Sequence, residues 1–233
     1  MTAISIIIPT YNEQANIAAC LQAIRSAAGA DVVEIIIADS PNSTDNLEEI
    51  AESYDVTYFK TQKAGRNFQQ NEGAKLALSD ILYFVHADTL VHPEFVNDVT
   101  SYIASGADMG CYRYVFDKYR NPLMYINTFF TRMPMLWCRG GDQTLFIKKE
   151  VFKALNGFCE KHIIMEEYDL LRRGIPKYTF KIIPKNVVVS ARKYAKNGYF
   201  RVQVANLKVM QRWLKHESEP EELYQLYKSL LNN

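Results

Sequence analysis

Cysteine is scarce in this sequence and follows no recognisable spacing. Among the 233 residues there are four cysteines, Cys20, Cys111, Cys138 and Cys159, and no two of them form a C-x-x-C pair. A zinc site therefore fits the sequence poorly, and Cys20 and Cys111 fall in stretches that are typical of a core helix and a core strand. We expect reduced, buried thiols in a cytosolic protein.

An excess of charge of one sign and long apolar runs are missing as well. Lysine and arginine total 27 against 26 for aspartate and glutamate, so the formal net charge is +1, and we expect no nucleic-acid partner. No eighteen-residue stretch is continuously apolar, and the opening MTAISIIIPTYNE has no basic segment. We therefore expect neither a membrane-spanning helix nor a secretory signal, and a cytoplasmic location.

The glycine-rich motifs that bind phosphate are absent too. Neither G-x-G-x-x-G nor G-x-x-x-x-G-K-[ST] occurs anywhere in the chain. These motifs supply the backbone cradle for phosphates in dinucleotide oxidoreductases and P-loop NTPases, so both classes are disfavoured. If a nucleotide binds here, a cation has to hold its phosphates.

The first ninety residues alternate short β-branched runs with segments of helical length. Continuous apolar strands separated by helices predict a parallel sheet that is covered on both faces, so this part is an α/β, Rossmann-like half. Strands are predicted at residues 4–8, 32–38, 56–60 and 81–85, and helices at residues 14–28, 44–54 and 67–79.

The pattern is less regular after residue 90, where we expect more strands and the second wall of a cleft. A hydrophobic content of 48% suffices for one core of ordinary size. We predict one domain over residues 1–198, with a first half (1–90) and a second half (91–198), and a helical extension over 199–233. Strands are predicted at 109–116, 143–147 and 179–183, and helices at 119–137, 149–155 and 166–173.

The helical extension has two faces of different character. A basic amphipathic helix either lies on an anionic membrane or packs its apolar face on its own domain, and the sequence leaves both open. Ser218-x-x-Glu221 resembles a capping box that opens a last helix to Leu231. The apolar face consists of Phe200, Val204, Leu207, Met210 and Leu214, and the basic face of Arg201, Lys208, Arg212 and Lys215.

Polar residues follow three of the predicted parallel strands. The carboxyl ends of parallel strands meet at one edge of the sheet, which is where such sheets bind ligands. An acidic residue after the second strand suits a nucleoside, so Asp39 is a candidate for nucleoside binding, although DSPNSTD is equally consistent with a turn cap. The residues at this edge are Pro9-Thr10-Tyr11-Asn12-Glu13, Asp39-Ser40 and His86-Ala87-Asp88.

Asp88 is the candidate anchor for a divalent cation. A carboxylate at this position can hold Mg²⁺ or Mn²⁺ against phosphate oxygens, and Lys63 and Arg66 in TQKAGRNFQQNEGA can add positive charge. His86 either binds the same cation or only donates a hydrogen bond to a backbone carbonyl.

Seven motifs follow one another along the chain: SIIIPTYNE, IIADSPNSTD, KAGRNFQQNEGA, YFVHADT, GGDQTLF, FKALNGF and MEEYDLLRRG. In this order they resemble the family 2 glycosyltransferases of GT-A fold, over roughly residues 3–198. Within that family the chain looks most like the short bacterial subgroup called rSAM/selenodomain-associated transferase 2, whose members carry a similar H-A-D and G-D-Q.

The resemblance implies a role for each matching position. The family's E-D pair, which contains the general base, falls on Glu166-Glu167, and Gly141, Asp142 and Gln143 would line the acceptor side of the donor sugar. Glu167, Glu166 and Asp142 are thus the expected catalytic residues. The expected donor-site residues are Pro9, Thr10, Tyr11, Glu13 and Asp39 for the nucleoside, His86-Ala87-Asp88 at the D-x-D motif, with His86 and Asp88 on the metal, and Arg66 and Arg192 for the diphosphate.

Two positions depart from the family pattern. His86 stands where most members have aspartate, and an imidazole suits Mn²⁺ better than Mg²⁺. Glu167 stands where many members have the aspartate base, so Glu166 or Asp169 are alternatives for that role, with Glu167 favoured.

The expected function is transfer of a sugar from a nucleotide donor, usually uridine-based in this family, to an acceptor that is lipid-linked, a saccharide or a peptide. A non-catalytic sugar-nucleotide scaffold or sensor is the alternative that the altered H-A-D keeps open. A nucleotidyltransferase is disfavoured, because PTYNEQAN stands where its glycine-rich loop belongs. The aromatics of residues 119–137 either pack in the core or form an exposed apolar floor for the acceptor.

Overall fold

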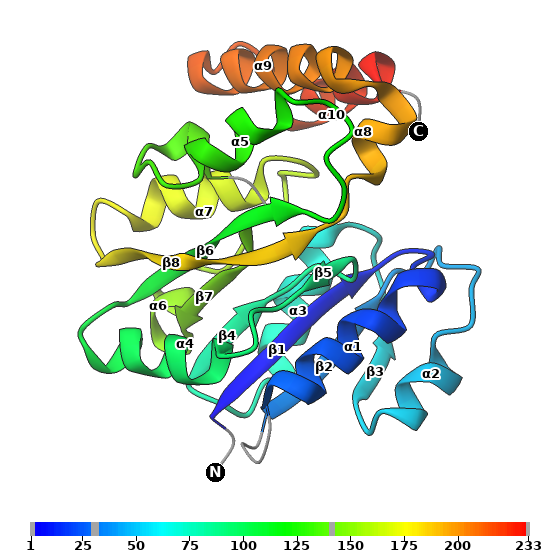
Figure 1. The fold of residues 1–233 in the computed structure, drawn as a ribbon, viewed down its shortest axis with the longest axis vertical. Helices are drawn as coiled ribbons and strands as arrows, with labels where there is room; N and C mark the ends of the chain where they lie inside the picture. Colours follow the sequence, from blue (N-terminus) through cyan, green and yellow to red (C-terminus); the bar gives the residue numbers. More distant parts are fainter. Residues whose placement is uncertain (1–2, 29–32, 140–142, 232–233) are drawn as a thin grey trace.

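The computed structural model describes residues 3–28, 33–139 and 143–231 and shows an α/β fold built on one sheet (Figure 1). Within these residues the sheet has eight strands in the order β3-β2-β1-β4-β7-β6-β8-β5. Helices flank the sheet, and the C-terminal helices lie together at one end of the molecule. The predicted α/β, Rossmann-like architecture with C-terminal helices is confirmed.

The first half of the sheet is parallel, as the sequence predicts. β1 pairs with β2 and β4, and β2 pairs with β3, all in parallel. The elements are β1 (Ile4–Thr10), α1 (Gln14–Ala28), β2 (Val33–Asp39), α2 (Glu48–Ser53), β3 (Thr57–Lys60), α3 (Arg66–Leu76) and β4 (Ile81–Phe84).

Burial on both faces explains the continuous isoleucine run of β1. Every residue of this strand is buried, with Ile6 in the cluster that contains α1 and Ile7 in the cluster on the opposite face. α3 covers that second face closely, because Gly73 leaves room for Ile7: a Cβ on Gly73 would lie 2.6 Å from the Ile7 side chain. The polar Gln69 of α3 then reaches the carbonyls of Thr10 (2.6 Å) and Ala38 (2.8 Å).

The second half of the chain extends the sheet with strands of both directions. β7 runs antiparallel to β4 and to β6, whereas β6 and β8 are parallel. The elements are β5 (Thr89–Leu90), α4 (Phe95–Ala104), β6 (Met109–Phe116), α5 (Met124–Phe130), the 3₁₀ helix η1 (Leu136–Cys138), β7 (Leu145–Lys148), α6 (Lys149–Ala154), α7 (Glu166–Gly174), β8 (Phe180–Val189), α8 (Arg192–Asn197), α9 (Tyr199–Lys215) and α10 (Pro220–Leu230).

Proline accounts for two differences from the predicted elements. The single helix predicted at residues 119–137 is wrong: it is split into α5 and η1, and Pro134 lies between them, where its ring and missing N–H disfavour a helix. β8 continues well past the predicted end at Ile183, because the pairing with β6 shifts register between Tyr112 and Arg113, opposite Pro184 and Lys185. Such an irregularity accommodates a proline that cannot donate to the ladder.

The C-terminal helices also differ in detail from the prediction. α10 begins one residue later than predicted, with Glu219 as N-cap, and the Glu222 carboxylate accepts a hydrogen bond from the Glu219 N–H at 3.2 Å. α9 packs on the domain through Val202, Ala205, Val209 and Trp213, which is not the apolar face that the sequence analysis singled out.

Two further expectations concern membrane spans and thiols. Among the described residues, no helix is both long enough and apolar enough to cross a bilayer. All four cysteines are free thiols, and Cys20 and Cys111 are buried as predicted. Burial raises the pKa of the Cys20 thiol to about 12.

Gly110 of β6 provides a test of how tightly the sheet is packed. A Cβ at this position would lie 2.3 Å from the backbone carbonyl oxygen of Lys181 and 2.4 Å from the Phe146 ring. Because neighbouring backbone cannot move aside without breaking the β6–β8 pairing, we expect Gly110→Ala to lower the free energy of unfolding by about 2 kcal/mol or more.

Chemical denaturation measures this change. Ser101→Thr, which adds one methyl group at an exposed position of α4, is the matched control and should change stability by less than about 0.5 kcal/mol. Equal stability of Gly110→Ala and the control would contradict the packing described here.

Candidate active site

The ends of the parallel strands converge as the sequence predicts. Thr10 at the end of β1 stands opposite Asp39 at the end of β2, and the chain after β4 continues into His86-Ala87-Asp88 beside them. Ala87 is buried, so the two polar residues on either side of it are the ones that reach the edge. Three segments that lie far apart in the sequence therefore form one polar edge.

Asp39 is buried and acts within this edge rather than as a turn cap. Its carboxylate accepts hydrogen bonds from the Thr10 hydroxyl at 2.8 Å and the Tyr58 hydroxyl at 3.2 Å. Burial, helped by the nearby Asp39, raises the pKa of Tyr58 to about 12. The capping role in DSPNSTD belongs to Asp45, which accepts from the Gln14 N–H at 2.8 Å at the start of α1.

The loop after β1 is held in a fixed shape. Asn12 adopts a left-handed backbone conformation with φ of 54°, and its side chain accepts hydrogen bonds from the Thr44 N–H (2.8 Å) and hydroxyl (3.2 Å). Pro9 is buried in β1, whereas Tyr11 is 58% exposed. Tyr11 is therefore exposed at this edge.

Arg192 at the start of α8 reaches this edge from the far end of the chain. Its guanidinium donates to Glu13 through two nitrogens, one of them at 2.9 Å, and its Nε lies 3.2 Å from a carboxylate oxygen of Asp88. Two of the predicted donor-site carboxylates thus share one arginine. Glu13 and Arg192 are 179 positions apart in sequence.

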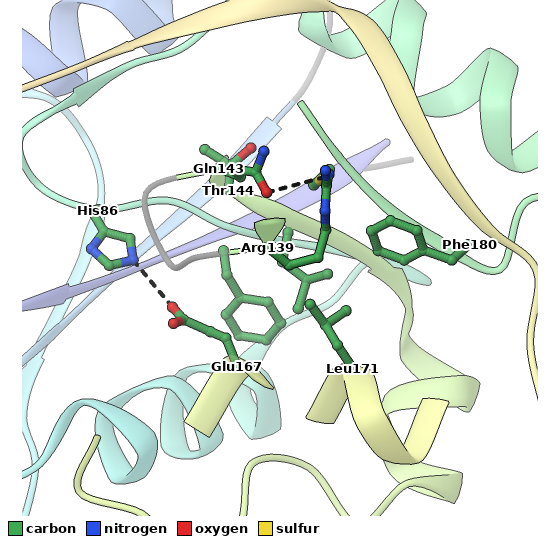
Figure 2. Close-up of a pocket in the computed structure, with 10 residues that line it drawn as sticks. His86, Arg139, Gln143, Thr144, Glu167, Leu171 and Phe180 are labelled. Atoms are coloured by element: carbon green, nitrogen blue, oxygen red, sulfur yellow. Dashed lines mark hydrogen bonds and ion pairs between the residues drawn. The ribbon is translucent and has the colours of Figure 1, made fainter. Parts of the chain in front are cut away.

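His86 lies between the two halves of the molecule and contacts both. Its Nε2 lies 3.3 Å from the Glu167 carboxylate (Figure 2), and its Nδ1 lies 3.4 Å from Nη1 of Arg66. Because a guanidinium can only donate, Nδ1 is the acceptor and Nε2–H donates to Glu167. Arg66 also pairs with Glu166 at 2.6 Å through its Nε.

The two glutamates at the start of α7 differ in environment. Only 1% of the Glu166 side chain is exposed, and burial raises the pKa of its carboxyl, although Arg66 opposes the rise. Burial alone would raise the pKa of Glu167 as well, but Arg66 and the hydrogen bond from His86 outweigh it and hold that pKa below the usual value. Glu167 is therefore the carboxyl group that stays ionised at neutral pH.

Glu167 and His86 line a small pocket beside the sheet, with a cavity volume of about 20 Å³. Gln143 also lines it, and its amide nitrogen is buried without a hydrogen-bond partner among the described residues. Gly141 and Asp142, which the sequence analysis also assigned here, lie outside the described residues. The lining residues are Phe84, His86, Cys111, Arg139, Gln143, Thr144, Leu145, Glu167, Leu171 and Phe180.

Arg139 is a pocket residue that the sequence analysis did not assign. Its side chain is buried, and it donates to the Thr131 carbonyl at 2.7 Å and to the Cys111 sulfur at 3.1 Å. Burial raises the pKa of the Cys111 thiol to about 11, although Arg139 opposes the rise. Its only sequence signal is its place beside Gly140-Gly141, which does not distinguish it from an ordinary surface arginine.

Glu13 and Asp88 are the residues of this edge that fit a divalent cation. Both carboxylates already converge on one positive group, the Arg192 guanidinium, and hard oxygen ligands suit Mg²⁺ and Mn²⁺. Both ring nitrogens of His86 are engaged with Glu167 and Arg66, so its contacts favour a different role from the predicted metal ligand.

Other potential metal ligands gather away from this edge. Among the described residues, Cys159, His162 and Asp169 form one cluster, and His92, Glu94 and Asp98 form another. Asp169 is paired with Arg173 at 2.8 Å, and Asp98 is paired with Lys185 at 2.5 Å. Basic side chains therefore already neutralise the central carboxylate of each cluster.

Comparison with known protein families identifies the family to which this chain belongs. The chain matches the family model described as Glycosyl transferase family 2 over residues 5–173, which is well over half of its length. The chain belongs to glycosyl transferase family 2.

Curated relatives of this family 2 protein share part of its sequence. An uncharacterized glycosyltransferase of Haemophilus influenzae is 24% identical over 192 residues, which are 76% of this chain and 63% of the relative. The dolichol-phosphate mannosyltransferase of Pyrococcus furiosus is 31% identical over 110 residues, which are 46% of this chain and 31% of the relative. The chain thus spans less than two thirds of the length of these relatives.

Solved structures show the same fold. S. aureus TarS 1-349 in complex with UDP-GlcNAc aligns with a TM-score of 0.67 at 17% identity, over 99% of this chain and 71% of that one. The mannosyltransferase PcManGT from Pyrobaculum calidifontis, in complex with GDP-Man and Mn²⁺, aligns with a TM-score of 0.69 at 18% identity, over 98% and 69%. The family 2 chain therefore has the GT-A fold.

The contact between His86 and Glu167 predicts a change in titration. In His86→Ala the hydrogen bond that lowers the pKa of Glu167 is lost, so this pKa should rise. Carbon-detected NMR titration of the glutamate carboxyl groups measures it without any substrate. His92→Ala, which removes a histidine outside the pocket, should leave the Glu167 titration unchanged, and an unchanged value in His86→Ala would contradict the described contact.

Proposed function

We propose that this chain is a glycosyltransferase that moves a sugar from a nucleotide-sugar donor, uridine-based, to an acceptor hydroxyl with inversion at the anomeric carbon. The observation that carries the proposal is the position of Glu167: an ionised carboxylate, oriented by His86, lies on a pocket wall beside the edge that holds Asp39 and Asp88. A base and a nucleotide site thus adjoin each other, which is what group transfer from a nucleotide sugar requires.

The nucleoside would bind at the ends of β1 and β2. Asp39, fixed by Thr10 and Tyr58, offers a carboxylate to a base N–H or a ribose hydroxyl, and the exposed ring of Tyr11 offers a stacking surface. Pro9 and Ala87 are buried beneath this edge and leave its polar neighbours facing the ligand. The fixed loop after β1 limits the reorganisation that binding requires.

The diphosphate would lie where Glu13, Asp88 and Arg192 meet. A divalent cation, Mn²⁺ or Mg²⁺, would be held by Asp88 and Glu13, and it would neutralise the charge that develops on the departing diphosphate. Arg192 must exchange one of its carboxylate partners for phosphate when the donor binds, because Glu13 and Asp88 now share it. Arg66 adds positive charge from the start of α3.

Glu167 is the proposed general base. Glu166 is enclosed and paired with Arg66, and Asp169 is held by Arg172 and Arg173, so neither alternative lines the pocket. The lowered pKa of Glu167 keeps it deprotonated and able to accept the proton of an acceptor hydroxyl. Asp142 stays a predicted catalytic residue.

Several finer assignments complete the proposal. The subgroup of rSAM/selenodomain-associated transferases, a bacterial origin, and a cytoplasmic location with peripheral contact at the inner face of the membrane rest on the sequence motifs and on the surface described below. The predicted division into residues 1–198 and a helical extension over 199–233 is proposed likewise. The acceptor is lipid-linked, a saccharide or a peptide.

A non-catalytic sugar-nucleotide scaffold is the second candidate. The observation that favours it is the ion pair between Arg192 and Asp88. If this pair never opened, Asp88 could not bind a cation and the protein would not catalyse transfer. The scaffold differs from the proposed enzyme in having no use for an ionised Glu167.

Substitution of Glu167 tests the catalytic role. Glu167→Gln should lower the rate of donor hydrolysis or transfer by about a hundredfold to ten-thousandfold, because the amide cannot accept a proton, while donor binding persists. Glu160→Gln, an exposed glutamate in the loop before α7, is the control with near-normal turnover. A Glu167→Gln variant as fast as the control would exclude this base.

Calorimetric titration tests the donor site. UDP should bind more tightly in the presence of Mn²⁺ than without it, and Asp88→Ala should lose this difference because the cation loses a ligand. GDP serves as the ligand control and Asp80→Ala, an exposed aspartate at the other end of β4, as the variant control. Absence of UDP binding under every condition would favour a repurposed fold over the proposed enzyme.

A further inference from the structure

Helix α9 is apolar on two opposite faces, and only one of them is covered. Val202, Ala205, Val209 and Trp213 face the domain and are buried. With 3.6 residues per turn, the residues on the opposite face recur at positions 200, 204, 207, 211 and 214. Four of these are apolar and exposed: Phe200, Val204, Leu207 and Leu214.

A second exposed apolar group lies beside this face, on α5. Asn127 of α5 accepts hydrogen bonds from Tyr199 at 3.1 Å and Gln203 at 2.8 Å of α9, so the two helices are neighbours, as Figure 1 also shows. The α5 face that points away from the buried Met124 and Thr128 is exposed. The outer apolar surface therefore comprises Tyr125, Ile126, Phe129 and Phe130 together with Phe200, Val204, Leu207 and Leu214.

Positive charge borders this surface and negative charge does not occur on its main helix. The sequence of α9, YFRVQVANLKVMQRWLK, contains no acidic residue. Its basic residues share one flank of the helix at helical spacing, and Arg201 and Lys208 form no ion pair among the described residues. Near α5, Arg132 lies over the Phe129 ring at 5.5 Å. The basic residues on the flank of α9 are Arg201, Lys208, Arg212 and Lys215.

We propose that the outer apolar surface docks on an anionic lipid bilayer. Apolar and aromatic side chains next to a row of basic residues combine the two attractions that hold a helix in the plane of a membrane interface. A second copy of this chain fits less well, because a symmetric contact places the same surface against itself, and α9 offers no acidic residue to pair with the basic row.

Docking would bring the proposed donor site to a membrane. Arg192 of α8 contacts Glu13 and Asp88, and Tyr194 of the same helix accepts a hydrogen bond from Asn127 of α5 at 2.9 Å. The docking helices are thus joined directly to the edge that would hold the diphosphate. A membrane-borne acceptor follows from this position and rests on the proposed function, whereas docking itself does not.

Sedimentation with lipid vesicles tests the proposal. The full chain should sediment with vesicles of equal parts phosphatidylcholine and phosphatidylglycerol and remain in solution with phosphatidylcholine alone. Arg201→Gln with Lys208→Gln should weaken binding by about fivefold for each charge removed. Lys153→Gln with Lys177→Gln, two exposed lysines outside α9, is the matched control and should bind as the unaltered chain does.

The apolar contribution is tested in the same assay. Phe200→Ser with Leu207→Ser should weaken binding to the anionic vesicles, whereas Leu78→Ser, which changes an exposed leucine between α3 and β4, should not. Absence of sedimentation with anionic vesicles, or equal losses in the test and control variants, would overturn the proposal. A dimer of the unaltered chain that light scattering shows to dissociate in Phe200→Ser with Leu207→Ser would also overturn the proposal, because a second copy would then cover this surface.

Calorimetric UDP binding by the same variants separates this proposal from the proposed function. All of them should bind UDP as the unaltered chain does, because none of the substituted residues contacts the donor edge. Vesicle binding without UDP binding would leave docking in place and reject the donor site. UDP binding without vesicle binding would support the donor site and reject docking.

Discussion

The burial of the Glu166 carboxylate is the constraint on which the candidate site depends. A carboxyl group with 1% of its side chain exposed is costly to ionise without a partner, and Arg66 supplies that partner from α3. Because α3 belongs to the first half of the sheet-forming chain and α7 to the second, this pair ties the two halves together at the pocket. The neighbouring Glu167 then titrates in the field of the same arginine.

Polar side chains of α3 strengthen that connection. The Asn67 amide donates to the carbonyls of Cys159, Glu160 and His162, and Asn71 forms two hydrogen bonds with the backbone of Phe158. The loop that leads into α7 is therefore fixed to α3 by its backbone. Buried polar contacts of this kind fix position more than they add stability, which is what a base on a pocket wall requires.

Charge compensation also organises the polar edge at the ends of the parallel strands. Glu13 and Asp88 would repel each other if Arg192 did not lie between them, and its arrival from α8 makes the C-terminal helices part of the site. Helix α9, which follows α8 directly, carries part of the outer apolar surface. Arg192 and the proposed membrane contact therefore belong to one helical segment. If membrane binding changed the position of Arg192 at the polar edge, the change would pass through this segment.

The sequence alone determined the elements whose pattern depends on local chemistry. The isoleucine run of β1 requires burial on both faces, and α1 and β6 begin and end at the predicted residues 14–28 and 109–116. The order of strands and helices also placed Thr10, Asp39 and Asp88 at one edge, because carboxyl ends of parallel strands must meet.

Contacts between distant residues were decided only by the tertiary structure. The sequence could not show that Arg192 lies between Glu13 and Asp88, that His86 turns toward Glu167, or that Arg139 is buried, since each depends on neighbours far away in the chain. The same holds for α9: periodicity indicated one apolar face, which contains Phe200, Val204 and Leu207, whereas packing against the domain buries a different face. The local sequence determines which side chains share a helix face. The free energy gained by tertiary burial then decides which face is covered.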